Sequence, residues 1–295
     1  MQKYFLLFLL SVILYGDDDV SGGVHSYYIS RLSDGSIINL PFRVMDVKWQ
    51  RDTNIMSIYS HMALEYRMPS GPNTFLETID AKNFSWDLRE LYFTWQLPDV
   101  EIRLGKQIHA WGSADANSPV DNLNAYDYYY MFSIGAEQKM GSYSLAGDYY
   151  LDDWKFGFYV SPFHHISRLP IDDPEFPMEL PANPKDKQIL PVEDPLEFAG
   201  DITKSFDSGD ITLSYFNGYD RSFSPLGFNV WDNAANNASE VKIDTIFSYR
   251  KTEVLGLGGV AFLGDVTLRA DVAYFTTKDR DVNLVEIEYR GNDLM

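Results

Sequence analysis

The sequence predicts an all-β protein, an antiparallel transmembrane β-barrel of at least 12 strands with long extracellular loops. Apolar and polar residues alternate over segments of about ten residues, a signature of membrane-spanning β-strands. The connections between these segments are short and long in turn, as in barrels with tight turns on one side and long loops on the other. Aromatic residues make up 15% of the chain, and their rings favour strands and membrane interfaces.

The composition excludes several classes of protein. The 295 residues include 43 Asp and Glu against 24 Lys and Arg, a net charge of −19, which argues against nucleic acid as a partner. The absence of cysteine excludes a disulfide scaffold and a thiolate metal site. A hydrophobic content of 45% is too high for a disordered chain.

The N-terminal residues predict a signal peptide over 1–16, followed by a barrel domain over 17–295. A basic start ending at Lys3 precedes an apolar run from Tyr4 to Tyr15, and Gly16 separates this run from three aspartates. The alternative is a helical membrane anchor, but the run is shorter than the ~20 residues that span a bilayer. We therefore expect the mature protein to leave the cytoplasm.

The alternation is clearest in the segment that begins at Met56. Five residues of one parity are apolar and those between them are mostly polar, which places Ile58 and Leu64 on one face and His61 and Glu65 on the other. The same split recurs over 241–250 and 266–277. One face suits lipid and the other suits water.

Thirteen segments follow this pattern, near 23–32, 42–51, 54–67, 86–97, 100–110, 141–151, 154–163, 197–206, 210–220, 240–250, 253–263, 266–277 and 282–290. Single-chain bacterial barrels have even strand numbers, so the odd count suggests that the chain is the N-terminal part of a larger barrel. For any one strand, a soluble sandwich or a β-solenoid is the alternative.

Tight connections are expected at Asp52-Thr53, Pro98-Asp99, Asp152-Asp153, Asp207-Ser208-Gly209, Lys251-Thr252 and Lys278 to Asp281. Long connections are expected at 68–85, 111–140, 164–196 and 221–239. One tight connection, Gly264-Asp265, falls where a long loop is due.

The segment after the strand at 100–110 supplies the candidate site. The alternation turns Arg103, Gln107 and His109 toward the lumen, and Gly105 leaves room for a neighbouring side chain or an inward loop. The loop from Gly112 to Tyr130 either folds inward as a constriction or remains at the surface with Asx-turns. The lumen or constriction candidates are Arg103, Gln107, His109, Trp111, Asp115, Asp121, Asn124 and Asp127.

The inward positions carry a nearly balanced charge, so no strong cation selectivity is expected. The acids are Asp46, Glu65, Glu90, Glu101, Asp148, Asp201, Asp244, Asp271, Glu286 and Glu288. The bases are Lys48, Arg67, Arg103, Lys155, Lys242, Arg250, Arg269 and Arg290.

No catalytic residue, cofactor or metal is expected. The oxygen-bearing side chains between Asp115 and Asp127 would suit Ca²⁺, but their spacing matches no calcium loop. Nucleophile elbows, zinc helices and phosphate loops do not appear in the sequence. A hydrolase assembled at the barrel rim from distant residues is the enzymatic alternative.

One stretch resembles a family of uncharacterised bacterial outer-membrane β-barrels related to alginate-export porins. The residues that carry the resemblance are Leu88-Arg89-Glu90-Leu91-Tyr92, Arg103-Leu104-Gly105-Lys106-Gln107, Trp111-Gly112-Ser113-Ala114-Asp115, Pro119, Asp121, Asn124, Asp127 and Gly218-Tyr219-Asp220-Arg221 with Pro225. The chain departs from the family at Ser113, where many relatives carry an acid, and at Ala125-Tyr126, which replaces a common Pro-Arg.

The resemblance implies a channel in the outer membrane of a Gram-negative-type cell that passes a solute or polymer through its lumen. The expected partners are outer-membrane lipid and lipopolysaccharide, an unknown solute and a periplasmic export partner. The alternative is a plugged structural or adhesive barrel that displays its loops without transport.

Overall fold

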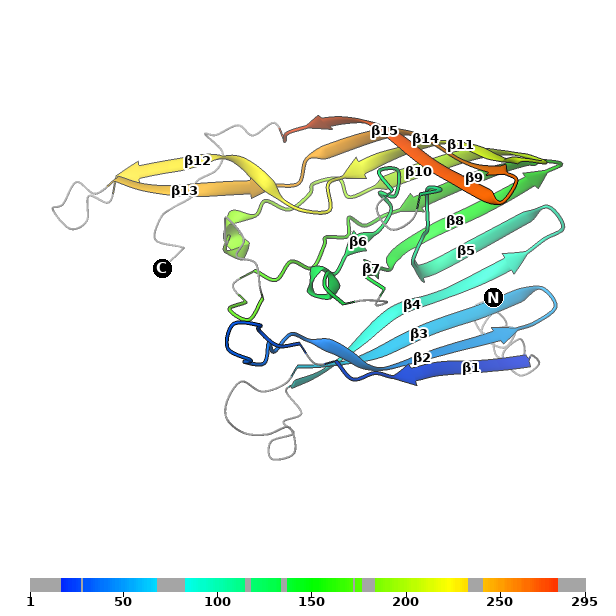
Figure 1. Ribbon diagram of the computed structural model, residues 1–295. Helices are drawn as coiled ribbons and strands as arrows, with labels where there is room; N and C mark the ends of the chain where they lie inside the picture. The colour runs from blue at the N-terminus through cyan, green and yellow to red at the C-terminus, as the bar shows by residue number, and fades with distance from the viewer. Residues whose placement is uncertain are drawn as a thin grey trace, which may run out of the picture.

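Eleven strands pair in one antiparallel sheet, in the order β1-β2-β3-β4-β5-β8-β9-β10-β11-β14-β15 (Figure 1). The computed structural model describes residues 17–27, 29–67, 83–114, 118–133, 137–171, 173–176, 184–232 and 241–280. Among these residues no α-helix forms, and no helical segment has the length and apolarity to cross a membrane. The predicted all-β antiparallel fold is confirmed.

The strands of this sheet are β1 (Asp17–Val24), β2 (Phe42–Asp52), β3 (Met56–Tyr66), β4 (Phe84–Gln96), β5 (Val100–Gln107), β8 (Ser142–Leu151), β9 (Trp154–Ser161), β10 (Glu197–Phe206), β11 (Gly209–Tyr219), β14 (Lys251–Leu263) and β15 (Val266–Lys278). Two small sheets lie outside it, β6 (Ala125–Tyr126) with β7 (Lys139–Met140) and β12 (Ser224–Asp232) with β13 (Val241–Ser248). The 3₁₀ helices are η2 (Tyr128–Tyr130) and η3 (Asp186–Gln188).

The sheet is strongly curved and its two edges are separate. Figure 1 shows it curving from β1 at the bottom to β15 at the top, with β6, β7 and η2 on the concave side. Within the described residues β1 and β15 form no ladder with each other. This part of the chain is therefore a curved open sheet and not the closed barrel that the sequence predicts.

The connections divide by length between the two ends of the sheet. Tight turns at 53–55, 97–99, 152–153, 207–208 and 264–265 alternate with long connections at 25–41, 67–83, 108–141, 162–196 and 220–250. Two of the turns use a backbone with positive φ, at Asp152 (φ 51°) and Gly264 (φ 62°), which Gly and Asp tolerate better than most residues. The turn at 264–265 thus belongs to the tight end after all.

Two expected strands differ from the structure. The first strand is β1 at Asp17–Val24 and not 23–32, because the long connection 25–41 leaves the sheet after Val24. The segment expected at 240–250 is a strand, β13, but it pairs with β12 inside the expected loop 221–239. Alternation reveals that a segment is extended but does not identify its partner. The expected strand at 282–290 lies outside the described residues.

The pairing of β11 with β14 removes the expected strand at 240–250 from the main sheet. The two strands form a continuous ladder from Gly209 opposite Ala261 to Tyr219 opposite Lys251. The segment 220–250 is therefore one long connection that carries its own two-stranded ribbon, β12–β13, which extends away from the sheet in Figure 1. The expected turn at Lys251-Thr252 is wrong, because both residues begin β14.

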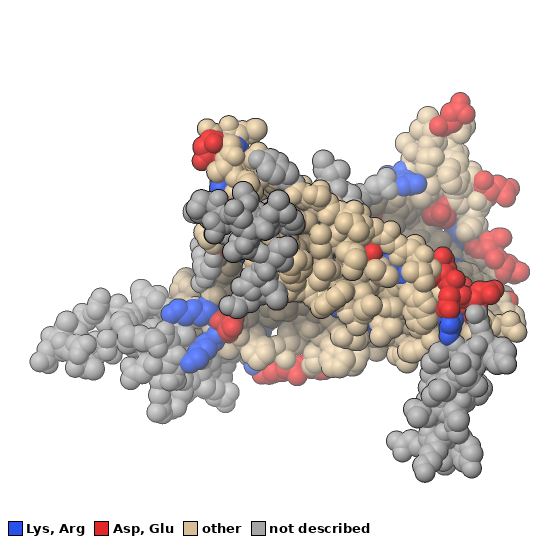
Figure 2. All heavy atoms as spheres, turned by 90° about the horizontal axis from the view of Figure 1, so that it is seen from below, with Lys and Arg blue, Asp and Glu red and all other residues tan. Residues whose placement is uncertain are grey.

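The convex side of the sheet is apolar and exposed. Ile202, Leu213, Leu257 and Val272 follow one another across β10, β11, β14 and β15, and each is between 41% and 68% exposed. Leu104, Leu145, Val160 and Phe198 make a similar row across β5, β8, β9 and β10. Figure 2 shows Asp, Glu, Lys and Arg gathered mainly toward the two ends of the face in view.

The hydrophobic cluster on the concave side is small and is completed by a loop. Ala146, Tyr159, Ala199, Phe216 and Val254 come from five neighbouring strands. Leu123, from the connection 108–141, is fully buried among them, and Trp111 packs at their margin. The connection therefore lies against the concave face of the sheet.

Gly105 sits where no larger residue fits without strain. Its φ of +141° lies outside the region that other residues prefer, and an added Cβ would lie 2.3 Å from the Leu91 carbonyl oxygen and 2.7 Å from Tyr92 Cα. The room that the sequence predicts at Gly105 is thus taken by the neighbouring strand β4 and not by an inward loop.

The substitution Gly105→Ala should lower the free energy of unfolding by about 1–3 kcal/mol, because it adds backbone strain and a clash with β4. Urea unfolding in detergent, followed by tryptophan fluorescence, measures the change. Gly227→Ala is the matched control, since a Cβ there meets no atom within 4 Å. Equal stability of the two variants would contradict the strained geometry.

Candidate functional site

The polar concave side of the sheet, together with the connection 108–141, forms the candidate site. The connection starts inward directly after β5, where the Ile108 amide donates to Glu90 Oε1 at 2.8 Å. It returns to the sheet through β7 and β8. Most of the predicted site residues therefore lie in one region, although they serve different contacts.

His109 and Asn124 form a clamp that closes the first part of this connection. The His109 amide donates to Asn124 Oδ1 at 3.1 Å, and Asn124 Nδ2 donates back to the His109 carbonyl oxygen. Both residues are buried, and His109 Nε2 lies 3.0 Å from Ser144 Oγ of β8. The clamp fixes the loop against the sheet without any exposed contact.

The imidazole of His109 is neutral at neutral pH. Burial, and to a smaller extent the positive charges of Arg103 and Lys139, lower the pKa of His109 to about 3. Its ring also packs edge-on against Tyr159, with 4.8 Å between the ring centroids. His109 is thus a packing and hydrogen-bonding residue with no proton to exchange near pH 7.

Gln107 precedes the clamp at the end of β5 and is also buried. Its Nε2 donates to the Ser144 carbonyl oxygen at 3.1 Å, whereas its Oε1 has no hydrogen-bond partner. Trp111 lies four residues further along and packs against the apolar cluster. Asp115 lies outside the described residues.

Asp127 belongs to a second contact, an ionic network between two long connections and β3. Arg168 donates to both oxygens of Glu65, at 2.8 and 3.0 Å, and to Asp127 Oδ2 at 3.2 Å. Asp127 also caps η2 by accepting from the Tyr129 amide at 3.1 Å. The network binds the connections 108–141 and 162–196 to each other and to the sheet.

Asp127 and Arg168, the two residues of this network that lie outside the strands, both have raised pKa values. Burial raises the pKa of Asp127 above its usual value, although the Arg168 guanidinium opposes the shift. Burial alone would lower the pKa of Arg168, but the hydrogen bonds and charge of Glu65, together with Asp127, raise it. Arg168 is therefore a permanent cation.

Asp121 pairs with a different cation, Lys139, which also donates to the His109 carbonyl oxygen at 3.3 Å. Burial raises the pKa of Asp121, although the ammonium group of Lys139 opposes the shift. Asp121 lies beside Asn122 and Arg221 at a pocket of about 360 Å³. Asp121 and Asp127 thus neutralise separate cations and do not form one ligand set.

Arg103 belongs to a charged row across the concave face. It lies 3.0 Å from Asp148 of β8, whose other oxygen is 3.5 Å from Lys155 of β9. Lys155 in turn lies 3.1 Å from Asp201 of β10. This charged row, defined as Arg103, Asp148, Lys155 and Asp201, alternates in sign, as the nearly balanced inward charges predict.

Two contacts that the sequence does not identify as site contacts hold the connection 108–141 to the far strands. Asp271 of β15 accepts from the amides of Ser113, at 2.9 and 3.0 Å, and Ala114, at 2.8 Å. Arg221 donates to both oxygens of the fully buried Glu197 at 2.8 Å and to the Leu123 carbonyl oxygen at 3.1 Å.

The sequence indicates a role for two of the residues that hold the connection 108–141, Arg221 and Asp271, but not for Arg168. Arg221 stands in a stretch that resembles the outer-membrane family, and Asp271 falls at an inward position of its strand. Arg168 lies in a proline-rich connection without periodicity, so nothing in the sequence indicates its partners, Glu65 and Asp127. Contacts across 100 or more residues leave no spacing pattern.

No group of three or more His, Asp or Glu residues that could hold a metal ion occurs in the described ranges. A comparison with known proteins finds no family model that matches the chain and no curated protein with significant sequence similarity to it. The resemblance to relatives of alginate-export porins therefore stays a prediction, and the functional argument depends on the geometry.

The stability of the protein should fall on acidification, in part through His109. Because its folded-state pKa of about 3 is below the ordinary 6.5, its contribution is complete above pH 6.5 and is lost as the pH falls toward 3. The slope should be about 1.4 kcal/mol per pH unit within this window. His109→Gln should remove this component, so the variant loses less stability than the wild type.

Thermal unfolding in detergent at pH 7 and pH 4.5, followed by circular dichroism, measures the difference. The control is His25→Gln, because the His25 side chain is 47% exposed. A wild type and a His109→Gln variant with the same acid sensitivity would show that His109 is not the buried neutral group described above.

Proposed function

We propose that this chain forms the wall of an outer-membrane channel that passes a solute or polymer along its polar concave side. The observation that carries the proposal is the inverted placement of side chains. Apolar residues are exposed on the convex side, whereas Asp148, Asp201 and Glu197 are buried on the concave side. This arrangement suits lipid outside and water or a polar solute inside.

The exposed apolar band favours a membrane over an aqueous environment. Soluble proteins rarely expose contiguous apolar patches beyond a few hundred Å². In a soluble β-sandwich the apolar face of one sheet would be covered by a second sheet. The described residues contain no such second sheet over the convex face. The strands of the sheet have 8 to 13 residues, close to the ~9–11 needed for a tilted membrane strand.

A lipid environment also requires that the edges of the sheet be paired. Unpaired backbone groups cost several kcal/mol each in the hydrocarbon region, so only closed barrels span membranes with strands. The proposal therefore needs further strands between β15 and β1. The segment 282–290 has the sequence pattern of a strand and lies outside the described residues.

The long and tight ends of the sheet give the proposed orientation. Long loops face outward and tight turns face the periplasm in outer-membrane barrels. The acidic outer loops would meet the divalent cations that bridge lipopolysaccharide. An export partner in the periplasm would act at the tight end. The resemblance to relatives of alginate-export porins supports the same reading.

The connection 108–141 is the proposed constriction of the channel. Its Leu123 packs against five strands, and its Ser113 and Ala114 amides bind the last strand of the sheet. A pocket of about 120 Å³ remains between Trp111, Val120 and the charged row. A solute would pass this narrow polar space, with Lys155 and Asp201 at its wall.

The second candidate function is a plugged barrel that only displays its loops. It is favoured by the several contacts that hold the connection 108–141 against the sheet. The connection is held at three points, by Arg168, by Arg221 and by Asp271. Conductance distinguishes the two functions, because a permanently plugged barrel passes no current. No covalent chemistry is proposed for either.

An arginine in the middle of the apolar band should prevent stable insertion. Leu213→Arg should cost about 2–4 kcal/mol in vesicles, whereas Leu263→Arg at the tight end of β14 should cost about 0–1 kcal/mol. Urea titration of the chain folded into phosphatidylcholine vesicles measures both. The two side chains are similarly exposed, Leu213 at 50% and Leu263 at 59%. An equal cost of the two substitutions would therefore indicate that the convex face lies in water.

Release of the constriction should increase conductance. Asp271→Ala removes three hydrogen bonds to the Ser113 and Ala114 amides, and each bond to a charged group contributes about 1.5–3 kcal/mol. We expect larger and noisier single-channel currents in planar bilayers. Asp265→Ala, in the β14–β15 turn, is the control of equal charge change.

Stable current steps in the wild type would support the channel. A folded wild type and a folded Asp271→Ala variant that both pass no current would favour the plugged barrel instead.

A further inference from the structure

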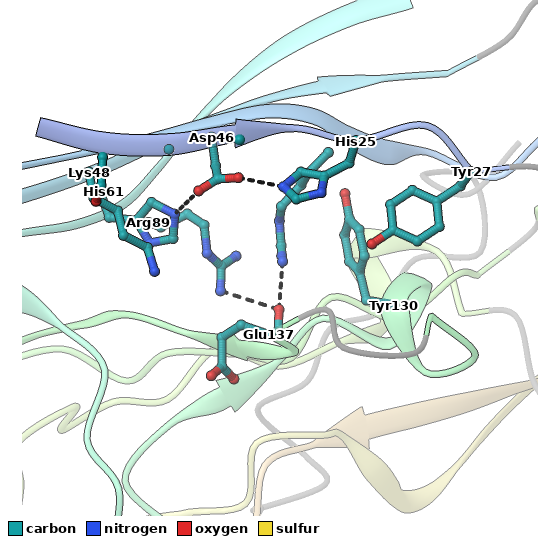
Figure 3. A pocket seen from close by; sticks show the side chains of 12 residues that line it. His25, Tyr27, Asp46, Lys48, His61, Arg89, Tyr130 and Glu137 are labelled. Carbon is teal, nitrogen blue, oxygen red and sulfur yellow. Dashed lines mark hydrogen bonds and ion pairs between the residues drawn. The ribbon is translucent and has the colours of Figure 1, made fainter.

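A pocket of about 410 Å³ lies between the first four strands and the connection 108–141 (Figure 3). It is lined by Ser21, Gly22, Gly23, His25, Tyr27, Arg43, Asp46, Lys48, His61, Arg89, Tyr130 and Glu137. The sheet supplies one wall and the loop residues Tyr130 and Glu137 supply the other. The sequence predicts Asp46 and Lys48 as inward charges, but none of the lining residues is among its lumen or constriction candidates.

The pocket is basic in a chain that is acidic overall. Three basic side chains line it, those of Arg43, Lys48 and Arg89, and the carboxylate of Asp46 faces them. Glu137 offers its backbone carbonyl oxygen, which accepts from Arg43 Nη1 at 2.6 Å, and its carboxylate points away (Figure 3).

The one facing carboxylate is already engaged by histidines. Asp46 Oδ2 lies 2.7 Å from His25 Nε2, and its Oδ1 lies 3.7 Å from His61 Nε2. Within the described residues Lys48 makes no hydrogen bond or ion pair, and its side chain is exposed to the pocket. Glu90 of β4 acts on Lys48 and Arg89 through its charge, but among the described residues it forms no hydrogen bond or ion pair with either of them.

The two arginines carry buried hydrogen-bond donors that lack acceptors. The side chains of Arg43 and Arg89 are only 10% and 1% exposed. Among the residues that the structure describes, the Nε and Nη2 atoms of Arg43 and the Nε atom of Arg89 have no hydrogen-bond partner. The nearest acids lie outside the pocket lining, Asp127 at 3.9 Å from Arg43 and Asp87 at 3.3 Å from Arg89. Buried donors without partners are costly, and a bound anion would satisfy them.

The charged row on the same concave face provides the contrast. There Arg103 and Lys155 each lie within 3.1 Å of a carboxylate oxygen. The two regions share one sheet and similar residue types. Among the described residues the row leaves one buried cationic donor without a hydrogen bond, Arg103 Nε, which lies 3.2 Å from Glu101 Oε1, whereas the pocket leaves three such donors. A general need for interior charge does not explain this difference.

The geometry favours a small oxyanion. A guanidinium group presents donors in a planar fork that fits carboxylate and phosphate oxygens. The Tyr130 ring stacks under the Arg43 guanidinium, 3.9 Å from its centroid, and holds that fork in place. The volume is near the lower end of the ~300–1,000 Å³ that small-molecule sites occupy.

We propose that this pocket binds the carboxylate or phosphate group of a small organic anion through Arg43, Arg89 and Lys48. The assignment of such anions as solutes rests on the proposed channel function, whereas the binding itself does not. The anion would occupy the space between the β2–β4 wall and Tyr130, on the concave face.

Calorimetric titration of the full chain in detergent tests the binding, with sodium succinate and sodium phosphate as probes and sodium chloride at fixed concentration. We expect saturable binding of at least one probe, and the tighter of the two identifies the carboxylate or the phosphate as the preferred group. Absence of saturable binding of both probes would overturn the proposal.

Two variants locate the site. Lys48→Met should weaken binding about tenfold, because it removes a charge that forms no hydrogen bond or ion pair within the described residues. Arg43→Lys keeps the charge but removes the Nε and Nη2 donors that have no partner among the described residues, so it should also weaken binding. Lys278→Met, near the end of β15, removes the same charge elsewhere and should bind as the wild type does. Thermal unfolding checks that each variant is folded.

Equal affinity of the wild type and the folded Lys48→Met variant would overturn the site, as would an equal loss in Lys278→Met. The channel proposal fails separately. Binding without any current would retain the anion site and reject the channel, whereas current without binding would do the reverse.

Discussion

Charged groups on the concave side of the sheet must be neutralised at close range, and the interior is organised around this requirement. Taking an ion out of water costs several kcal/mol unless a partner and further hydrogen bonds replace the lost hydration. The charged row meets the requirement within the sheet, by alternating acids and bases on neighbouring strands. Where the sheet lacks a partner, a long connection supplies one.

The same requirement explains how the long connections acquire fixed positions. Glu65 of β3 and Glu197 of β10 are buried acids that receive arginines from connections, Arg168 and Arg221. Asp271 receives backbone amides instead. These contacts join residues between 24 and 158 positions apart in sequence, so each closes a loop at an entropic cost. The positions of the long connections therefore depend on which strand residues lie on the concave side of the sheet.

The sequence predicts those features of the structure that depend on residues close together in the chain, and it misses those that depend on distant residues. Alternation within a strand is local, so it identifies ten of the eleven sheet strands and turns Arg103 and Asp148 inward. It misplaces the first strand, whose residues 17–24 are too polar and glycine-rich to alternate. It also cannot distinguish β13, which pairs with β12, from a strand of the main sheet. The residues of one strand do not show which other strand it pairs with through backbone hydrogen bonds.

The contacts of the candidate site also differ in how far apart their residues lie in the sequence. His109 and Asn124 are 15 residues apart, and their residue types already suggest a structured loop. The partners Arg168 and Asp271 lie 41 and more than 150 residues from the loop atoms that they contact. The cationic pocket assembles from four strands and a loop, and no pair of its residues forms a motif. Such sites become visible only when burial and pairing are known together.

The ladder between β11 and β14 has a consequence for how the protein can change over evolution. Because these strands pair directly along their length, the ribbon β12–β13 is an insertion between two neighbours and contributes nothing to their register. The base of the ribbon is held by the connection 162–196, since Phe247 is buried and its carbonyl oxygen accepts from the Leu190 amide. Insertions in the ribbon beyond this contact would leave the register of the main sheet unchanged, so the chain can gain length there without rebuilding the sheet.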